Sequence, residues 1–414
     1  MSKRVVITGM GIISPIGNSI STYWNNLKNG VCGIDTITAF KEYDLPVKIA
    51  GQIKEFNGAN WGIDNATARK ADRYSLLTYA AAAQAMEESG LIAGDNIDPD
   101  KLGVYIGSGI GGMTTFVNES KKLFDEGVRR ISPLFIPMMI SNMASGNIAI
   151  KYNAQGPCLP IVTACATGTH SIGEAFRAIS HGYAEAIITG GSEAAINPLS
   201  IGGFNNSRAL SRSEDPKRAS LPFHKDREGF VIAEGSGILV LEEYERAVKR
   251  GAKIYAEVCG YGNTCDAYHY TAPRPDGSTA AKALSISLKE AGFNDSDTLH
   301  INAHGTGTPL NDKSETIAIK IAIGEQAAKK SIICSTKSMT GHMLGAAGGA
   351  ECIATVLALK NGIIPPTIGL DNIDPECDLD YTPLVARKAN ITIAISNSLG
   401  FGGHNGCIAI RKLK

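Results

Sequence analysis

The sequence lacks any pattern in its cysteines that would build a covalent framework or a zinc site. It has nine cysteines in 414 residues, an odd number, scattered along the chain and without a C-x-x-C pair. Disulfide frameworks and zinc sites rest on paired cysteines at short spacings, so we expect neither. Free thiols are typical of a reducing compartment, and we therefore expect a cytoplasmic protein.

Long hydrophobic runs and an excess of charge are also missing. No apolar stretch approaches the roughly 18 residues of a membrane-spanning helix, so we expect no membrane insertion. The apolar stretch near the N-terminus is interrupted by Gly9, Gly11 and Pro15 and has no small-residue cleavage pattern, which argues against a signal peptide. Lysine plus arginine equals aspartate plus glutamate at 40 each. The overall charge therefore does not favour nucleic acid, and a charged partner must bind a local patch.

The length and the order of the predicted elements indicate two halves. The chain exceeds what one hydrophobic core normally spans, and 43% of its residues are hydrophobic against 19% charged. Short apolar runs alternate with helical patterns, which is typical of an α/β fold with buried sheets covered on both faces. A strand followed by a small-residue turn and a closely packed helix occurs at 159–182 and again at 332–359. We predict two halves of similar order, residues 1–251 and 252–414.

The first of these segments places one cysteine at a corner between a strand and a helix. Residues 161–163 are β-branched or hydroxylic and predict a buried strand, and apolar residues recur at helical spacing across 172–179. Cys165 lies between the two. The free N–H groups of a helix N-terminus stabilise a thiolate and can bind an oxyanion, so Cys165 is a candidate nucleophile. The alternative is a buried cysteine that packs as a small hydrophobic residue.

Two glycine-rich segments follow predicted strands. Residues 5–8 predict a strand that leads into a turn at 9–17, and residues 102–106 predict a strand before the loop 107–112. That loop fits G-x-G-x-x-G, the phosphate-binding pattern of dinucleotide folds. Such folds also need an acidic residue about 20 positions later, after a second strand, whereas residues 117–124 predict a helix. An NAD-dependent oxidoreductase is therefore kept only as an alternative.

Three further loops carry groups that suit acyl chemistry. His304 follows a predicted strand, Lys337 and His342 precede a predicted helix, and Phe401 lies between glycines. A cysteine with one histidine is typical of thiol proteases and acyltransferases. Two histidines that donate N–H groups suit a more specific task, which is to hold a thioester carbonyl while an enolate forms.

At this point the sequence resembles a known family, the elongating β-ketoacyl-acyl-carrier-protein synthases of fatty-acid synthesis, and within it synthase II. The resemblance covers residues 3–413. Eight segments carry it in order: VVITGMGIISPIG, GSGIGG, TACATGTH, GGSEAA, DREGFVIAEGSG, AHGTGTPLND, STKSMTGHMLGAAG and SNSLGFGGHNG. It implies the thiolase fold, with duplicated halves stacked in five layers as α-β-α-β-α, and a homodimer.

The resemblance also implies roles for the residues singled out above. Cys165 corresponds to the nucleophile that takes the acyl chain from acyl carrier protein, and its N–H with that of Phe401 would form the oxyanion hole. His304 and His342 correspond to the pair that positions the malonyl thioester, supports its decarboxylation and stabilises the enolate. Lys337 corresponds to the lysine that tunes the site near His304.

Substrate and ion contacts follow from the same resemblance. Thr306 and Thr308 correspond to hydroxyls that bind the phosphopantetheine arm, Phe401 to a gate residue, and Ile110 to a residue of the acyl pocket. No cofactor is required. A structural Na⁺ or K⁺ is expected at a set of oxygen-bearing residues seen in relatives: Asn302, Glu315, Glu351, Asn397 and Ser398.

The acidic helix of acyl carrier protein requires a basic surface despite the neutral overall charge. Five residues match such positions: Arg69, Lys70, Arg129, Arg130 and Arg208. The sequence departs from synthase II at Leu399, where phenylalanine is frequent, and at His404, where threonine is common. Both lie in the loop of Phe401, so the departures concern chain length and loop motion rather than the chemistry.

Several functions stay open beside β-ketoacyl synthase II. A ketosynthase of a polyketide or other secondary-metabolite pathway uses the same three groups on other acyl chains. A non-catalytic chain-length partner usually replaces the nucleophile, whereas Cys165 is present. The initiating synthase III pairs cysteine with histidine and asparagine, whereas His342 supplies a second histidine here.

Overall fold

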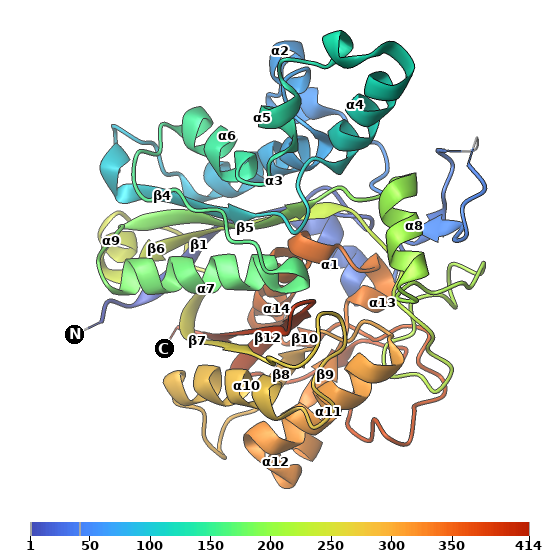
Figure 1. Cartoon of the computed structure of the whole chain (residues 1–414). Coiled ribbons are helices and arrows are strands. Elements are labelled where there is room, and N and C mark those ends of the chain that lie inside the picture. Colours follow the sequence, from blue (N-terminus) through green and yellow to red (C-terminus); the bar gives the residue numbers. More distant parts are fainter. Residues whose placement is uncertain (1, 41–42, 414) are drawn as a thin grey trace.

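The computed structural model describes residues 2–40 and 43–413. Helices and sheets alternate in five layers from top to bottom of Figure 1. The two outer helical layers contain α3 (Arg73–Ser89) with α6 (Met143–Tyr152), and α10 (Ser278–Glu290) with α11 (Pro309–Ile323). The central layer contains α7 (Thr167–Ser180) and α14 (Ala347–Asn361), and each of these two helices contacts strands of both sheets. The expected α-β-α-β-α arrangement is therefore confirmed.

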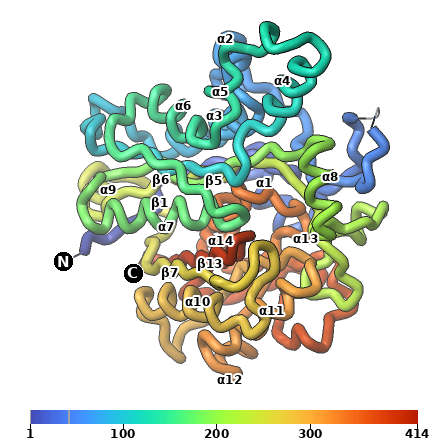
Figure 2. Tube along the Cα trace, in the orientation of Figure 1, coloured from blue at the N-terminus to red at the C-terminus, as the bar shows by residue number. Residues whose placement is uncertain are grey.

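Nine strands form the two sheet layers. The upper layer has the order β4 (Leu102–Gly107), β5 (Ala186–Glu193), β6 (Gly235–Glu243) and β1 (Val5–Ile13). The lower layer continues with β7 (Ala256–Cys265), β13 (His404–Arg411), β12 (Ile393–Gly400), β8 (Leu299–Asn302) and β9 (Ile332–Cys334). Three antiparallel residue pairs between β1 and β7 join the layers. Val258 pairs with Val5 on one side and Ile410 on the other, so both chain ends lie on the same side of the molecule (Figure 2).

The two layers repeat one topology. In the upper layer β4 is parallel to β5, which is antiparallel to β6, which is antiparallel to β1. In the lower layer β8, β12, β13 and β7 follow the same sequence of directions. Cys158 forms a parallel bridge beside β4, at the place that β9 takes beside β8. The predicted boundary at 251/252 falls between α9 (Tyr244–Lys249) and β7. As an exact position it stays a prediction.

The glycines near the N-terminus lie within a strand rather than in the turn that we expected at 9–17. Strand β1 runs to Ile13 because Gly9 and Gly11 let helix α3 approach the backbone of the strand. A Cβ on Gly11 would lie 1.9 Å from the carbonyl oxygen of Ala81, and one on Gly9 would lie 2.1 Å from that of Ala85. The glycines thus serve packing between a helix and a strand.

The segment before Cys165 differs from the expected buried strand. Residues 159–163 form no strand, although the N–H of Leu159 donates to the carbonyl of Val104 at 3.0 Å. Leu159 and Val162 are half exposed. The segment lies at the edge of the upper sheet, beyond β4. Val162 faces outward, whereas Ile161 packs partly buried against the core.

The remaining elements surround these layers. They are α1 (Ile20–Lys28), α2 (Asn65–Ala68), α4 (Met113–Glu126), α5 (Phe135–Met139), α8 (Pro198–Asn206), α12 (Glu325–Lys330) and α13 (Lys337–Thr340), with the short pairs β2 (Asp35–Thr36)–β3 (Ile49–Ala50) and β10 (Ile363–Ile364)–β11 (Arg387–Lys388). Among the residues that the structure describes, no helix is both long and apolar enough to cross a membrane.

Candidate active site

Cys165 lies in a strained turn at the start of the central helix α7. The preceding residue, Ala164, has φ +50°, in the left-handed region that residues with a Cβ seldom adopt. A short 3-10 helix, η4 (Ala164–Ala166), then leads into α7. The same geometry recurs in the second half, where Leu344 has φ +48° and η5 (Leu344–Ala346) leads into α14. The predicted corner at Cys165 therefore exists, and Gly345 is its counterpart.

The predicted chemical groups meet at one small pocket of about 70 Å³. Six residues singled out from the sequence line it: Cys165, His304, Thr306, Thr308, His342 and Phe401. They come from separate loops of both halves, at the N-terminus of α7, after β8, after α13 and after β12. Leu399, one of the two departures from synthase II, lines the same pocket.

The end of β12 passes directly over the nucleophile. A Cβ on Gly400 would lie 3.3 Å from the backbone nitrogen of Cys165 and 2.6 Å from the carbonyl oxygen of Thr163. The backbone N–H of the next residue, Phe401, acts on the Cys165 thiol and lowers its pKa. Because residue 400 is glycine, it has no side chain to crowd the Cys165 N–H, and backbone N–H groups of this kind can stabilise an oxyanion.

Burial of Cys165 favours its protonated thiol and opposes the thiolate that the helix N-terminus is expected to stabilise. Burial raises the pKa of Cys165 to about 12, and nearby carboxylates, Glu193 first, add to the increase. The charge of Lys337 and the N–H of Phe401 oppose it but do not outweigh the burial. The field of the helix N-terminus thus acts on a neutral thiol, which must lose its proton as it reacts.

The two histidines form a neutral pair beside the nucleophile. The ring centroids of His304 and His342 are 5.3 Å apart, with their planes at 85°. Burial lowers the pKa of each well below 6.5, and the charge of Lys337 lowers both further. Neither ring nitrogen of His342 has a hydrogen-bond partner in the described part of the chain. A neutral imidazole has one N–H donor, so each ring can donate to a substrate oxygen.

Lys337 acts from behind the pocket. Its Nζ lies 3.4 Å from Nδ1 of His304 and forms a buried ion pair with Glu351. Burial raises the pKa of Glu351 to about 7, although Lys337 opposes this change. Lys337 is not part of the pocket lining, so its influence on the site is electrostatic and acts on Cys165 and His342 as well as on His304.

The residues of the expected cation site lie around the same histidine. The carboxylate of Glu315 accepts the backbone N–H of His304 at 2.7 Å and the side-chain N–H of Asn397 at 2.7 Å. Three buried oxygens of the set have no hydrogen-bond partner among the described residues, and they suit a hard monovalent cation: Asn302 Oδ1, Asn397 Oδ1 and Glu351 Oε2. The Ser398 hydroxyl fits less well, because it is engaged with Thr169 Oγ1 at 2.7 Å.

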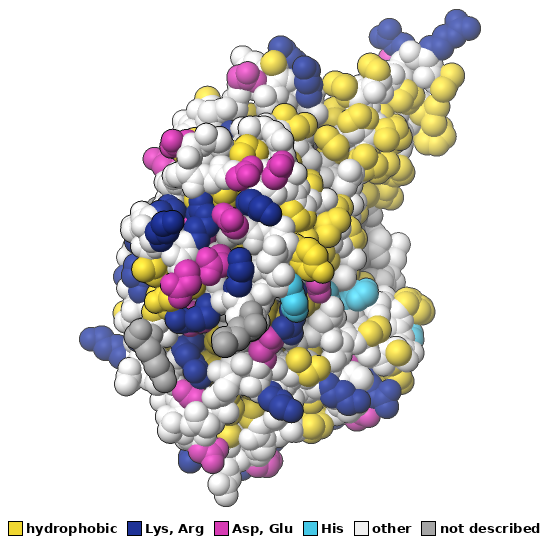
Figure 3. Space-filling model, turned by 90° about the vertical axis from the view of Figure 1, so that its left-hand side faces the viewer, with side chains coloured by type: hydrophobic (Ala, Val, Ile, Leu, Met, Phe, Trp, Pro, Cys, Tyr) yellow, Lys and Arg dark blue, Asp and Glu magenta, His cyan; other side chains and the backbone are white. Residues whose placement is uncertain are grey.

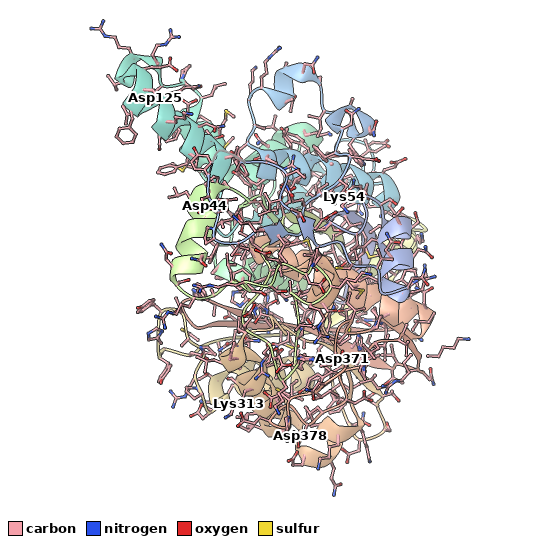
Figure 4. All side chains as sticks on the ribbon, turned by 90° about the vertical axis from the view of Figure 1, so that its right-hand side faces the viewer. Asp44, Lys54, Asp125, Lys313, Asp371 and Asp378 are labelled. Atoms are coloured by element: carbon pink, nitrogen blue, oxygen red, sulfur yellow. The ribbon has the colours of Figure 1, made fainter. Side chains whose placement is uncertain are left out.

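The structure leaves the other predicted binding residues outside the pocket. Ile110 is exposed in the loop after β4. Three of the basic residues lie in different parts of the chain: Arg69 follows α2, Arg208 follows α8, and Arg130 is the last residue of the 3-10 helix η3 (Val128–Arg130), which follows α4. The remaining two, Lys70 and Arg129, are adjacent to Arg69 and Arg130. Figure 4 shows Asp125, near the end of α4, on a projection that stands clear of the main body.

Several pocket residues had no catalytic or binding role predicted from the sequence. The ring of Phe230 lies edge-on to His342, with centroids 5.1 Å apart, and also meets Phe204 at 5.5 Å. Asp266, Thr271 and Asn311 also line the pocket. Phe230 belongs to a segment that carries the family resemblance, and this was the signal available for it. Nothing in the local sequence indicates that its ring faces a histidine more than a hundred residues later.

The dinucleotide interpretation of the 107–112 loop is wrong. The N–H groups of Gly109 and Ile110, which would bind a pyrophosphate, donate to the carboxylate of Glu193 at 2.8 and 3.2 Å. Those donors are therefore occupied by the protein itself.

Comparisons with known proteins agree with this geometry. Residues 2–247 match the family described as "Beta-ketoacyl synthase, N-terminal domain", and residues 255–371 match "Beta-ketoacyl synthase, C-terminal domain". The chain is 50% identical over 411 residues to 3-oxoacyl-(acyl-carrier-protein) synthase 2 of Synechocystis sp., which covers 99% of this chain and 98% of that protein. It is also 50% identical over 413 residues to the synthase 2 of Staphylococcus aureus, covering 100% and 99%.

A solved structure extends the likeness to three dimensions. A chain of the solved structure described as a type II PKS acyl-carrier protein in complex with its ketosynthase matches this chain with a TM-score of 0.91 and 34% identity. The match covers 100% of this chain and 100% of that chain. This likeness confirms the thiolase-type fold that the sequence resemblance implied. Because the matched domains extend from residue 2 to residue 371 and the relatives are half identical over the full length, the chain belongs to the β-ketoacyl synthase family of condensing enzymes.

Proposed function

We propose that the chain is a β-ketoacyl-acyl-carrier-protein synthase II, which condenses acyl and malonyl groups carried on acyl carrier protein and lengthens fatty acids by two carbons. The observation that carries the proposal is the pocket itself, in which a cysteine at a helix N-terminus faces two neutral imidazoles. The name shared by the relatives at 50% identity points to the same reaction.

In the first half-reaction Cys165 takes the acyl chain. Its sulfur attacks the thioester carbonyl, and the N–H groups of Cys165 and Phe401 stabilise the oxyanion that forms. The C–S bond to the carrier then breaks. Burial raises the pKa of the Cys165 thiol, whereas the charge of Lys337 lowers it and so favours the thiolate that attacks. The proton that Cys165 gives up is passed to the departing phosphopantetheine sulfur, and Thr306 and Thr308 at the pocket wall bind the phosphopantetheine arm.

In the second half-reaction the malonyl group loses CO₂ next to the two histidines. The C–C bond to the carboxylate breaks, and its electron pair forms an enolate whose oxygen accepts N–H groups from His304 and His342. The enolate carbon attacks the acyl-Cys165 carbonyl, the C–S bond breaks, and the Cys165 thiolate that is released takes up a proton from water. Two neutral imidazoles suit this step, because each has one N–H group that can donate a hydrogen bond to the enolate oxygen.

Replacing the nucleophile tests the proposal. Cys165→Ala should abolish acyl transfer and condensation, because no sulfur remains to hold the chain. Malonyl decarboxylation should stay measurable, because His304 and His342 remain. Condensation at the wild-type rate in Cys165→Ala would overturn the assignment. A series of acyl carrier proteins with different chains, with the products resolved by mass, separates fatty-acid elongation from the polyketide alternative.

We further propose that the chain acts as a homodimer in the cytoplasm. Large apolar side chains are exposed on and beside the projection at α4, with Phe124 84% and Val128 73% accessible, and Leu159 and Val162 at the sheet edge are half exposed. Figure 3 shows hydrophobic side chains gathered on this side. A patch of this kind typically marks an interface between proteins. Sedimentation equilibrium should give twice the chain mass, and a monomer at micromolar concentration would overturn the proposal.

Cofactors are not needed for this chemistry, since every group that moves electrons belongs to the substrates or to Cys165. We propose Na⁺ or K⁺ as a structural ion held by Asn302, Glu351 and Asn397. Its contribution would be a fixed positive charge among buried oxygens. Unfolding in buffers that contain only a large organic cation tests this, because a bound ion stabilises the folded chain.

A further inference from the structure

Glu193 is a fully buried carboxylate that takes no part in the chemistry above. It is the last residue of β5 and accepts hydrogen bonds from groups of both halves. The Ser108 hydroxyl donates at 2.7 Å, the N–H groups of Gly109 and Ile110 at 2.8 and 3.2 Å, and the N–H of Gly345 at 3.0 Å. These donors stabilise the ionised form of the carboxylate, because an unpaired buried charge is costly.

The duplication explains what Glu193 contacts. Glu193 ends β5 as Gly400 ends β12, and Gly345 follows Leu344 as Cys165 follows Ala164. At Gly400 the missing side chain leaves the Cys165 N–H open. In the equivalent place of the other half, the side chain of Glu193 lies against the Gly345 N–H. Glu193 therefore fills the donor site that is the counterpart of the proposed oxyanion hole.

Electrostatics favour a carboxylate there. Helix α14 has 15 residues, and its N-terminus, extended by η5, directs positive partial charge toward Gly345. Burial raises the pKa of Glu193, while the Ser108 hydroxyl and the three N–H donors oppose that change. The negative charge of Glu193 in turn reaches the nucleophile and contributes to the raised pKa of Cys165.

Contact with the nucleophile runs through the 108–110 loop. A Cβ on Gly109 would lie 2.7 Å from Oε2 of Glu193 and 3.3 Å from the carbonyl oxygen of Ala164. The loop therefore packs between the carboxylate and the strained turn that presents Cys165. We propose that Glu193 is a positioning residue, which fixes the 108–110 loop against that turn and so holds Cys165 for acyl transfer. This inference rests on the proposed role of Cys165.

Glu193→Gln is the sharpest test, because it keeps the size but turns one acceptor oxygen into an NH₂ group that faces N–H donors. The rate of acyl transfer to Cys165 should fall by about tenfold or more, the effect of losing hydrogen bonds to a buried charge. Malonyl decarboxylation should be unchanged, since the loop does not hold the histidines. The rate of alkylation of Cys165 at a fixed pH of about 8 should rise, because loss of a negative charge near the sulfur lowers the pKa of the thiol.

A matched control separates positioning from general damage. Glu242 is also fully buried, in the neighbouring strand β6. Its carboxylate accepts a hydrogen bond from Arg250 at 2.7 Å, and it does not line the pocket. Glu242→Gln should lower Tm without separating the two half-reactions. If Glu193→Gln lowers both half-reactions in parallel and leaves the rate of Cys165 alkylation unchanged, Glu193 is merely structural and the inference fails. It also fails if acyl transfer keeps its wild-type rate.

Ser108→Ala covers the case in which Glu193→Gln does not fold. It removes one donor to the carboxylate and should slow acyl transfer more mildly, again without an effect on decarboxylation. Equal rates of acyl transfer in Ser108→Ala and wild type would then overturn the inference. Cys165→Ala is measured beside both variants. If that variant still accepts an acyl chain, the proposed function fails first; if it does not, the result for Glu193 stands on its own.

Discussion

Lys337 controls the protonation state of the candidate site without reaching the substrate pocket. Its ammonium group lies beside Nδ1 of His304 and is paired with Glu351, and all three groups are buried. Burial alone disfavours an imidazolium, and a fixed positive charge beside it disfavours it further. The histidines are therefore neutral donors over a wide pH range, which is the form that an enolate oxygen needs.

Lys337→Met should move the acid limb of malonyl decarboxylation to higher pH. The pKa of His304 lies well below 6.5 in the wild type, partly because of the Lys337 charge. Without that charge the pKa rises toward 6.5, so His304 gains a proton, and loses activity, at a higher pH than before. The measurement is the pH–rate profile of decarboxylation in both proteins. Lys337→Arg keeps the charge and is the control; an acid limb that stays in place in Lys337→Met contradicts the argument.

Single residues show where inference from sequence succeeds and where it stops. The turn into helix α7 places Cys165, and the loops place His304 and His342, because these depend on local sequence, although the strand expected before Cys165 does not form. The charge state of Cys165 does not follow from local sequence. It is set by burial among residues from distant segments and by the carboxylates of Glu193 and Glu351, which lie in other elements.

At the scale of elements, the end of β12 sets the geometry of the proposed oxyanion hole. The strand passes over the N-terminus of α7 with Gly400 against the Cys165 nitrogen. Side chains at the strand end would fill the space that a thioester oxygen needs. The equivalent strand end in the other half carries Glu193 and shows what such a side chain does there.

Gly400→Ala should therefore slow acyl transfer by about 100-fold, the usual effect of losing one oxyanion donor. The added methyl would lie 3.3 Å from the Cys165 nitrogen and 2.6 Å from the Thr163 oxygen, so the donor is blocked or displaced. Malonyl decarboxylation should persist. Burst kinetics with acyl carrier protein measures the first step. Gly146→Ala in α6 is the control, since a methyl there meets only Met143 Sδ at 3.7 Å; similar rates for the two variants would refute the proposed hole.

Two elements differ from the prediction made from the sequence, one at glycines and one at a β-branched run. Gly9 and Gly11 indicated a turn, yet they lie within β1, because a glycine in a strand can equally allow a helix to pack closely. The β-branched run at 161–163 indicated a buried strand, yet it follows a sheet edge. In both cases the local pattern is compatible with two outcomes, and only the position of a distant element decides between them.

For the whole molecule, the duplication was visible in element order but hardly in residues. The two halves share strand order, strand directions and the left-handed residue before each central helix. They differ at the position after the left-handed residue, which is Cys165 in the first half and Gly345 in the second. Selection on packing keeps a topology while residue identities diverge, so the repeat could be predicted only weakly from the sequence.

Recognition of acyl carrier protein should depend on basic side chains on the α4 projection. Reversing Arg129 and Arg130 to glutamate should raise KM for carrier-bound substrates several-fold while kcat stays the same, because an acidic helix is repelled without a change in the pocket. Steady-state kinetics at low and high salt measures this, and the difference should shrink with salt. Reversing Lys282 and Lys289 on α10, in the outermost layer on the other side, is the control. An unchanged KM excludes this surface.

Buried neutral histidines should make the fold sensitive to acid, and His300 isolates the effect. It lies in β8, where Nδ1 donates to the carbonyl of Ile332 at 2.8 Å, and burial lowers its pKa to about 4. The unfolded chain binds a proton near pH 6.5, whereas the folded chain does not until about pH 4. The stability that His300 contributes is therefore present above pH 6.5 and is lost as the pH falls toward 4.

Comparison with His300→Phe makes this measurable, because all other groups titrate in both proteins and cancel. Relative to the variant, the wild type should lose about 3 kcal/mol of unfolding free energy between pH 7 and pH 4. Urea titrations at a series of pH values give the difference. The variant itself should be less stable at pH 7, since the hydrogen bond to Ile332 is lost. A difference that stays constant with pH would mean that His300 takes up its proton at the same pH in the folded and unfolded chains, and that β8 is more accessible to water than its packing indicates.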